Sequence, residues 1–311
     1  MRMRRYLGCL AIVLCLSPAC VGRKRWHSST LFFFDTVCDL NLCCGAEEYK
    51  VLEKEISDIF SRVEDSFTPG AEDYSAPWVI ELFGPARQVY LDSGGAFDIT
   101  VGPLSDLWGF HGGPQRVPSA GEIRAALEHV GMDRVGLESG RLIVPSGTVF
   151  DWGGIAKGFG VDLAARAVIG RGAKNGFINA GGDLYCWGQN PEGKPWRVGI
   201  KHPRGEGFFG VLNISGVGAA TSGDYQRYFE ESGVRYHHLF DPKTGFPARG
   251  KQSVTVVGPE TTICDALSTA VFIHPKPEEF LRKYPEYGAV IVDEKGKYCL
   301  LGKTYGATFV Q

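Results

Sequence analysis

The sequence predicts an α+β fold in which largely antiparallel sheets pack against helices, and three observations lead to this prediction. The segments with strand character come in runs, and the helices lie between these runs instead of following single strands. No predicted βαβ unit carries a G-x-G-x-x-G motif, which leaves a Rossmann fold without support. Glycine accounts for 42 of the 311 residues, about twice the usual ~7%, which indicates many tight turns.

The composition is that of an ordinary globular protein. Hydrophobic residues make up 44% of the chain, charged residues make up 22%, and the formal net charge is −2. This balance excludes a disordered or fibrous chain and gives no basic surface for nucleic acid, so no nucleic-acid partner is expected. The length fits one large domain or two modest ones.

The N-terminus has the features of a bacterial lipoprotein signal. Three arginines lie within residues 1–5, and an apolar stretch of ten residues, Leu7 to Leu16, is too short to span a bilayer. A small residue, Ala19, immediately precedes Cys20. We therefore expect a signal peptide over residues 1–19, lipidation of Cys20, a tether over residues 20–29 and one folded domain over residues 30–311. The alternative is a simple signal peptide with an incidental cysteine.

The first half of the folded domain predicts a strand followed by helices. The β-branched and aromatic run Thr30–Cys44 predicts a strand, and apolar residues at helical spacing predict a helix over Glu47–Val63. A second helix over Trp78–Leu91 is expected to be interrupted at Pro85. Ser119 with Glu122 forms a capping box that starts a helix running to about His129. Two short strands, Arg134–Leu137 and Arg141–Val144, follow.

The second half is dominated by strands. A Gly-Gly turn leads into a helix over Ile155–Ile169, and a last helix is expected over Cys264–Ile273. Strands are predicted at Gly176–Trp187, Trp196–His202, Gly210–Ser215, Tyr225–Glu230, Gln252–Gly258, Ala289–Val292 and Tyr298–Leu301. Six cysteines lie outside the signal, with no C-x-x-C pair, and most are expected to be small buried side chains. Whether any of them form a disulfide is left open.

Asp265 and Thr269 are four residues apart, so on a helix they share one face. A carboxylate and a hydroxyl form a hard oxygen donor pair that suits Mg²⁺. The alternative is that Asp265 caps the helix and complements its dipole.

The run from His237 to Pro247 contains tandem histidines before a turn, Asp-Pro-Lys-Thr-Gly. A histidine such as His238 at the end of a strand can project into a cleft and shuttle protons. The alternative is a strand pair with one face exposed.

The Gly153-Gly154 turn leads into a helix that carries Lys157, a suitable arrangement for a diphosphate. The alternative is a Gly-rich turn with a solvated lysine. Asp98 has the chemistry to accept hydrogen bonds from a ribose or an adenine amine, and it is equally able to cap the helix near Pro103.

Taken together and in order, the motifs resemble those of the ApbE-type FAD:protein FMN transferase family. They read AFD-x-TVGPL, WGF, GGIAKGFGVD, NAGGDL, ATSGDY, HHLFDPKTGFPA and CDALSTA, and the resemblance spans about residues 30–311. H-x-x-D-P-x-T-G-x-P and DALSTA are the most specific of these motifs. The resemblance implies a T-fold-like flavin transferase domain over residues 30–311.

The resemblance also implies an activity. Members of the family use Mg²⁺ and FAD, cleave the pyrophosphate of FAD, and attach FMN to a Thr or Ser hydroxyl of an acceptor protein with release of AMP. The alternatives are an FAD pyrophosphatase that gives FMN and AMP, and a non-catalytic FAD-binding lipoprotein. We expect a periplasmic protein that is anchored to a bacterial membrane by its lipid and that modifies a subunit of a membrane redox complex.

Residue roles follow from the resemblance. Asp265 and Thr269 are implied to bind the metal together with a backbone carbonyl near Ala156. His238 is implied to accept the proton of the attacking hydroxyl. The remaining implied contacts are with FAD: Ala96, Phe97 and Asp98 line its site, Lys157 lies near its phosphates, and Leu239 offers a backbone contact.

The sequence departs from the family pattern at two places. Phe34-Asp35-Thr36 stands where relatives usually carry Met-Gly-Thr, and the loop over residues 64–74 is shorter and lacks an asparagine that contacts the flavin. Tyr74 and Trp78 are candidates for stacking on the flavin and are equally consistent with ordinary packing.

Overall fold

The computed structural model describes residues 25–68 and 73–309 of the chain. The predicted signal peptide, Cys20 and half of the predicted tether lie outside the described residues. The other half, residues 25–29, is not a tether, because it forms the start of strand β1 (Arg25–Phe33) and pairs with β2 (Thr36–Cys44). In the part of the chain that is described, no helix is both long enough and apolar enough to cross a membrane.

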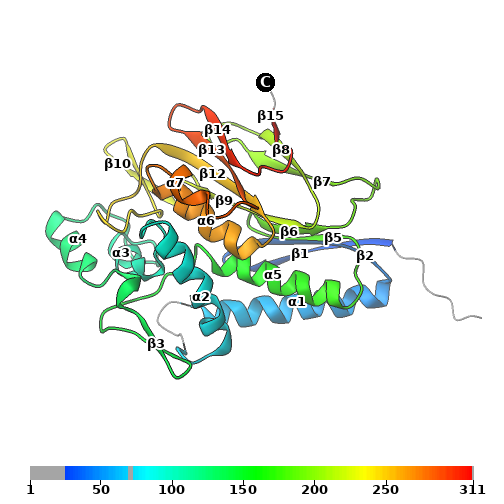
Figure 1. Cartoon of the computed structure of the whole chain (residues 1–311), viewed down its shortest axis with the longest axis horizontal. Helices are drawn as coiled ribbons and strands as arrows, with labels where there is room; N and C mark the ends of the chain where they lie inside the picture. Colours follow the sequence, from blue (N-terminus) through cyan, green and yellow to red (C-terminus); the bar gives the residue numbers. More distant parts are fainter. Residues whose placement is uncertain (1–24, 69–72, 310–311) are drawn as a thin grey trace, which may run out of the picture.

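An eight-stranded antiparallel sheet forms the centre of the molecule, with strand order β1-β2-β5-β6-β9-β12-β13-β14 (Figure 1). Its strands are β1 (Arg25–Phe33), β2 (Thr36–Cys44), β5 (Gly176–Ala180), β6 (Asp183–Trp187), β9 (Val217–Gly223), β12 (Lys251–Gly258), β13 (Gly288–Asp293) and β14 (Tyr298–Gly302). A second antiparallel sheet joins β7 (Trp196–Lys201), β8 (Phe208–Ile214) and β15 (Thr308–Phe309). Two hairpins, β3–β4 (Gly136–Glu138, Arg141–Ile143) and β10–β11 (Tyr228–Glu231, Val234–His237), complete the strands. The predicted fold class is confirmed.

Helices cover one face of the central sheet. The chain forms α1 (Ala46–Ser66), α2 (Pro77–Asp92), α3 (Gly102–Leu107), α4 (Ala120–Leu127), α5 (Ala156–Gly170), α6 (Thr261–Ile273) and α7 (Glu278–Leu281). α1, α5 and α6 pack on the sheet, and α2 packs on α6 (Figure 1). The capping box of Ser119 and Glu122 at the start of α4 is present as predicted.

Alternate residues of the central strands face two different cores. Val256 belongs to the cluster under the helices, whereas the next residue, Val257, belongs to the cluster under β7 and β8. Ala220 and Ala219 divide in the same way on β9. Because successive side chains of a strand point to opposite faces, the β7–β8–β15 sheet must cover the face that the helices leave open. β9 and β12 are therefore buried on both sides.

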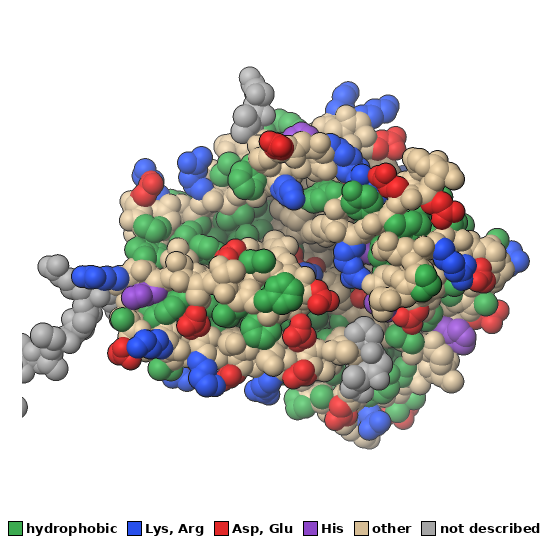
Figure 2. Space-filling model, turned by 180° about the vertical axis from the view of Figure 1, so that it is seen from behind, with side chains coloured by type: hydrophobic (Ala, Val, Ile, Leu, Met, Phe, Trp, Pro, Cys, Tyr) green, Lys and Arg blue, Asp and Glu red, His purple; other side chains and the backbone are tan. Residues whose placement is uncertain are grey.

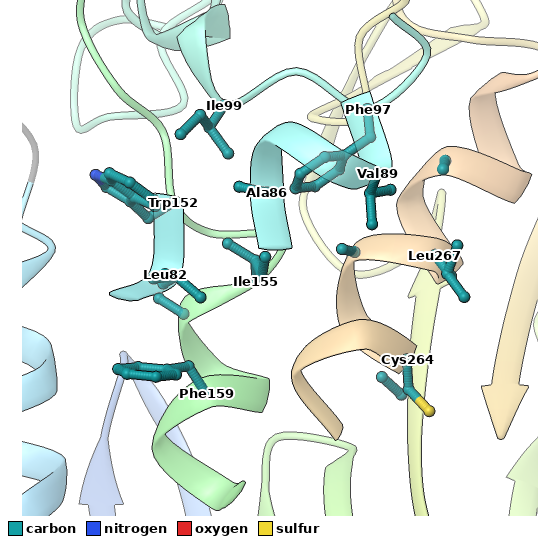
Figure 3. Close-up of a cluster of buried hydrophobic side chains, with 14 of the residues drawn as sticks. Leu82, Ala86, Val89, Phe97, Ile99, Trp152, Ile155, Phe159, Cys264 and Leu267 are labelled. Atoms are coloured by element: carbon teal, nitrogen blue, oxygen red, sulfur yellow. The ribbon is translucent and has the colours of Figure 1, made fainter. Parts of the chain in front are cut away.

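The cluster under the helices is continuous from α2 to α6. Phe97 and Ile155 enter it from the loops before α3 and α5, and Leu267 and Cys264 enter it from α6 (Figure 3). Burial raises the pKa of the Cys38 thiol to about 11 and that of Cys186 to about 12. Four of the six described cysteines are buried, which confirms the prediction that most of them are small buried side chains.

The predicted single strand over Thr30–Cys44 is wrong, because the segment forms the β1–β2 hairpin. Phe34 and Asp35 both have positive φ, 57° and 54°, as a two-residue hairpin turn requires. The turn lacks the usual Asn-Gly signal, and tertiary contacts hold it in place of glycine. The Phe34 ring packs on Phe60 with centroids 5.2 Å apart, and its N–H donates to Glu64 Oε1 at 2.7 Å.

Further differences from the predicted elements are local. α2 is continuous through Pro85, and the buried side chains Leu82, Phe83 and Ala86 hold it against the core. The predicted strand Gly176–Trp187 is the β5–β6 hairpin, which turns at Gly181-Gly182. The strand predicted at Tyr225–Glu230 lies slightly later in the chain, as β10. β9 and β11 were not predicted.

Figure 2 shows the molecule from behind, with side chains of both charge signs interspersed over this face and a hollow near its centre.

Tyr74 packs against Phe150, with ring centroids 5.8 Å apart. Trp78 lies between the Arg62 guanidinium, 4.2 Å from the centroid of its ring, and the Phe159 ring, 6.2 Å from it. Both side chains have the ordinary packing contacts that the sequence left as one alternative.

Candidate functional site

Helix α6 carries Asp265 and Thr269 on one face, and a residue of α5 caps its N-terminus. Both oxygens of the buried Asp162 carboxylate accept hydrogen bonds there, from the Thr261 N–H at 2.9 Å and the Thr262 N–H at 2.8 Å. Asp265 accepts instead from the Gly158 N–H of α5, at 3.2 Å. Its alternative role as the cap of its own helix is therefore wrong.

Lys157 and two carboxylates form a buried charged cluster between α5, α6 and β6. The Lys157 ammonium lies 2.9 Å from Asp183 Oδ2 and 3.6 Å from Asp265 Oδ2, and it donates to the Gly153 carbonyl at 2.9 Å. The two carboxylates expose only 4% and 5% of their side chains. Lys157 keeps 26% of its side chain exposed, but its ammonium is paired with both carboxylates, so the alternative of a lysine held by solvent alone is wrong. Asp183 was noted in the sequence only as part of a Gly-rich turn.

The electrostatics of this cluster follow from burial and from its excess of negative charge. Burial and the neighbouring Asp183 raise the pKa of Asp265 above its ordinary value, and Lys157 opposes that rise. Burial alone would lower the pKa of Lys157, but Asp183 and Asp265 together raise it. Two carboxylates share one ammonium, so the cluster carries an excess of negative charge that a further cation would neutralise.

Thr269 lies beside two serines and a glycine turn. Ser222 Oγ on β9 lies 2.7 Å from Ser268 Oγ and 3.0 Å from Thr269 Oγ1. A Cβ atom at Gly154 would lie 3.1 Å from Thr269 Oγ1 and 3.3 Å from the Phe97 ring. Glycine at this position therefore lets the turn approach both side chains, so that Phe97, Gly154 and Thr269 lie together.

The same glycine turn connects to Ala156, which is the first residue of α5 and is buried. Its N–H donates to the Trp152 carbonyl at 2.9 Å. The carboxylates of Asp265 and Asp183 and the hydroxyl of Thr269 are oxygen donors of the kind that Mg²⁺ prefers. Among residues 25–68 and 73–309, no group of three His, Cys, Asp or Glu side chains that could hold a metal ion was found.

Asp98 caps the turn before α3 and connects it to the segment around Met132. Its Oδ1 accepts from the Thr100 N–H at 2.8 Å, and its Oδ2 accepts from the Met132 N–H at 3.2 Å. Burial raises the pKa of this carboxyl to about 6. Of the two roles open from the sequence, the structure favours the cap at the turn that leads into α3. Ala96, beside it, is buried.

The tandem histidines have different surroundings. His237 is buried, with Nε2 lying 2.8 Å from the Ala248 carbonyl and Nδ1 accepting from the Leu239 N–H at 3.3 Å. Burial lowers its pKa to about 4. Leu239 is thereby tied within the chain, because its carbonyl also accepts from the Ala248 N–H at 2.8 Å. His237 is thus a structural residue.

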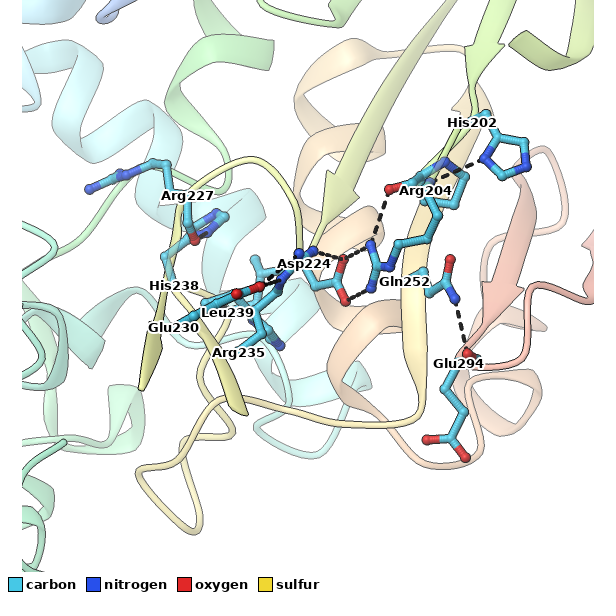
Figure 4. Close-up of polar contacts among 12 residues, drawn as sticks. His202, Arg204, Asp224, Arg227, Glu230, Arg235, His238, Leu239, Gln252 and Glu294 are labelled. Carbon is cyan, nitrogen blue, oxygen red and sulfur yellow. Dashed lines mark hydrogen bonds and ion pairs between the residues drawn. The ribbon is translucent and has the colours of Figure 1, made fainter. Parts of the chain in front are cut away.

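His238 is only partly buried and projects toward Arg227, as Figure 4 shows. Its Nδ1 lies 3.1 Å from the Arg227 carbonyl. A carbonyl oxygen can only accept, so Nδ1 carries the proton and Nε2 keeps a free lone pair. Burial, with the neighbouring Arg227 charge, lowers the pKa of His238 to about 3. The imidazole is neutral at physiological pH and can accept a proton at Nε2.

A histidine that the sequence reasoning missed lies beside this region. His111 Nδ1 lies 2.7 Å from Asp106 Oδ1, and its Nε2 lies 3.3 Å from Asp151 Oδ2. The hydrogen bond with Asp151 is the main cause of a raised pKa for His111. Asp151 also accepts from the Gly153 N–H at 2.9 Å, so this network extends to the glycine turn. WGF was recognised as a motif, but the residue after it gave no signal.

The segment from Arg227 to Pro247, which carries His238, is bound to the WGF motif. The Trp108 Nε1–H donates to the Gly245 carbonyl at 3.0 Å, and the Phe110 ring lies 6.3 Å from that of His238. Arg227 donates to the Phe110 carbonyl. The charge of Asp151 also acts on His238. The loop from Asp151 to Lys157 therefore connects the histidine region with the buried charged cluster.

The sequence of this chain is similar to those of known proteins of one family. The profile of the ApbE family matches residues 34–291. FAD:protein FMN transferase of Haemophilus influenzae is 38% identical over 191 residues, a match that spans 58% of this chain and about half, 55%, of that relative. FAD:protein FMN transferase of Treponema pallidum is 29% identical over 92% of this chain and 90% of its own length.

A solved structure agrees with these matches. The crystal structure of the ApbE protein from Thermotoga maritima superposes with a TM-score of 0.83 at 32% identity, covering 88% of this chain and 96% of that one. The family match includes the glycine turn, both aspartates of the charged cluster and the histidine hairpin. The chain belongs to the ApbE family.

Proposed function

We propose that this protein is an Mg²⁺-dependent FAD:protein FMN transferase. The observation that carries the proposal is the Lys157–Asp183–Asp265 cluster, buried beside the glycine turn in a chain of the ApbE family. In the proposed reaction an acceptor Thr or Ser hydroxyl attacks the phosphorus of the FMN half of FAD. The new P–O bond forms as the pyrophosphate P–O bond breaks, and AMP leaves.

Each residue of the site has a separate role in the proposed reaction. His238 Nε2 accepts the hydroxyl proton, since its lone pair is free and its imidazole is neutral at physiological pH. The N-terminus of α5, which follows the Gly153-Gly154 turn, would attract the diphosphate through its positive dipole end. The Phe97 ring, packed beside Gly154, provides an apolar wall.

Asp265 and Thr269 would hold the metal, with the carbonyl near Ala156 as a further ligand by family resemblance. The donor set supports this role, because it consists of hard oxygens and carries more negative charge than Lys157 neutralises. Bound Mg²⁺ would supply charge neutralisation for the diphosphate. Because Asp183 also contacts Lys157, we propose that it holds this lysine near the phosphates.

We also propose that the mature chain is anchored through a lipid on Cys20, faces the periplasm and modifies a membrane redox-complex subunit. The support is the sequence of residues 1–20 alone. Cys20→Ala is expected to move the protein from the membrane fraction to the soluble fraction of cells. Retention of the variant in the membrane would contradict lipid anchoring.

The test of the activity uses the chain without residues 1–20, incubated with FAD and Mg²⁺, with and without a Thr-containing acceptor protein. AMP and covalently bound FMN are measured together, with Asp58→Asn on exposed α1 as a matched carboxylate control. Acceptor-dependent FMN attachment with equal AMP release is the expected result. AMP with free FMN regardless of acceptor would make the protein a pyrophosphatase. FAD binding without AMP would make it a binding protein.

A further inference from the structure

A cavity outside the site described above lies beside the β10–β11 hairpin. Its volume is about 350 Å³, and the β10–β11 hairpin, the start of β12 and the loop before β8 form its walls. Arg235 and His237 line it, whereas Tyr236 and His238 alternate to the other face of the strand. None of the predicted flavin or metal residues lines it.

The lining of this cavity is cationic. Four basic side chains line it, and the only carboxylates in its wall are those of Asp224 and Glu294, so the lining carries net positive charge while His237 is neutral. The basic side chains are Arg204, Arg235, Arg249 and Lys251.

Two of the four basic side chains, Arg204 and Lys251, already have hydrogen-bond partners in the protein, and these contacts hold the walls of the cavity together. Arg204 Nη1 donates to Asp224 Oδ1 at 2.7 Å, and its Nη2 pairs with the other oxygen of the same carboxylate (Figure 4). Lys251 donates to the carbonyls of Phe272 and His274 at the end of α6, at 3.1 and 2.9 Å. Asp224 itself is buried, with 8% of its surface exposed. These contacts fix the cavity without a ligand.

The remaining donors are the guanidinium groups of Arg235 and Arg249. Arg235 Nε and Nη2 share one oxygen of the exposed Glu230, and Nη1 stays 3.9 Å from Asp224, beyond hydrogen-bond distance. Arg249 is exposed and donates through Nη1 to the Arg235 carbonyl at 2.8 Å. Among the described residues, no carboxylate pairs with Arg249 Nη2 or Nε.

We propose that this cavity is a binding site for a small oxyanion of the phosphate class. Guanidinium groups bind such anions through paired, charge-assisted hydrogen bonds, and the volume lies near the lower end of the ~300–1,000 Å³ typical of small-molecule sites. The site is separate from the flavin site and does not depend on the transferase activity. It is still a near neighbour, because His237 precedes His238 and Asp224 lies two residues after Ser222.

The test titrates inorganic phosphate into the metal-free and FAD-free protein at low ionic strength, with binding followed by calorimetry. Wild type is expected to bind with a dissociation constant below about 10 mM. Arg249→Glu is expected to weaken that binding at least about ten-fold. Lys174→Glu makes the same change of net charge at an exposed lysine outside the cavity and is expected to leave binding within about two-fold.

Three results would overturn the proposal. The first is the absence of saturable phosphate binding in the wild type. The second is equal weakening in Arg249→Glu and Lys174→Glu, which would reduce the effect to net charge. The third is full displacement of phosphate by FAD in the presence of EDTA, which would place the anion in the flavin site. Thermal melts of both variants that match the wild type establish that the fold is retained.

Discussion

The buried charged cluster and the histidine region hold their ionisable groups in different ways. Lys157, Asp183 and Asp265 lie on two helices and a central strand, and they contact one another inside the protein. His238 lies at the end of a short hairpin, is partly exposed, and contacts a backbone carbonyl. The first arrangement fixes charge before any ligand arrives, and the second keeps a neutral group that can take up a proton. The difference fits the proposed division of roles, in which the cluster would hold the metal that neutralises the diphosphate and His238 would serve the acceptor.

The largest expected effect comes from the charged cluster. Asp265→Asn keeps the size of the side chain and removes its negative charge, so AMP release and FMN attachment should both fall below detection while some FAD binding remains. FAD binding is followed by fluorescence and turnover by AMP release, with Asp58→Asn as the control. Full activity of Asp265→Asn would remove the metal assignment.

His238→Gln tests the other region, and its effect on chemistry should be smaller. The loss of a positioned base costs about 10²–10⁴-fold in rate, whereas FAD affinity should stay unchanged. The measurement is a single-turnover rate of FMN attachment alongside an FAD titration. An unchanged rate would exclude the role as a base and leave the comparison with only one catalytic region.

The pH dependence sharpens this prediction. The pKa of His238 is lowered to about 3, so its imidazole stays unprotonated from pH 5 to 8 and should cause no loss of rate in that range. A wild-type rate that falls between pH 7 and 6, with the fall absent in His238→Gln, would show that the base titrates at its ordinary pKa instead.

Asp162→Ala probes the contact that aligns the two helices of the cluster. Loss of this cap should destabilise the fold by about 2 kcal/mol, the upper end for a helix cap, because the carboxylate accepts from Thr261 and Thr262 and is buried. Urea denaturation measures the change. Ser119→Ala, which removes the cap of the exposed helix α4, should cost about 1 kcal/mol and leave activity intact. Equal costs would contradict the special position of Asp162.

The smallest expected effect is that of His111→Gln, with a loss of activity of about ten-fold, the equivalent of one charged hydrogen bond. The pKa of His111 is raised above its ordinary 6.5 by Asp151 and Asp106. Its stabilising contribution is therefore present below pH 6.5 and is lost as the pH rises through the raised pKa. The difference in melting temperature between wild type and His111→Gln should be larger at pH 6 than at pH 9. A constant difference would mean that His111 acts through packing alone.

The sequence predicted the five longest helices and the motif-bearing turns, because each leaves a local signal, whereas the short helix α7 was missed. The apolar spacing of α1 and the capping box of α4 are examples. Strands failed where the signal was not local. β9 reads Val-Gly-Ala-Ala-Thr-Ser-Gly, which has low strand propensity, yet it is buried between two cores. The turn at Phe34-Asp35 depends on packing against Phe60, which lies distant in the sequence.

The candidate site was predicted in outline, and its partners were not. Asp265, Thr269 and Lys157 could be found from helical spacing and from family resemblance. The pairing of Lys157 with Asp183 could not, because it joins a helix to a strand that follows it in the chain. The two roles left open for Asp98 were separated by the hydrogen bonds that it accepts from Thr100 and from Met132, which lies 34 residues away.

The hydrogen bond from Trp108 to the Gly245 carbonyl has a consequence for protein engineering. It joins two motifs that lie 137 residues apart in the chain, and Gly245, with a φ of 73°, packs against α4, where an added Cβ would lie 2.5 Å from Ile123. The segment from Arg227 to Pro247, which carries His238, therefore cannot be exchanged on its own. A chimera that takes this segment from a relative should also take the WGF turn and α4, since the three segments pack against one another.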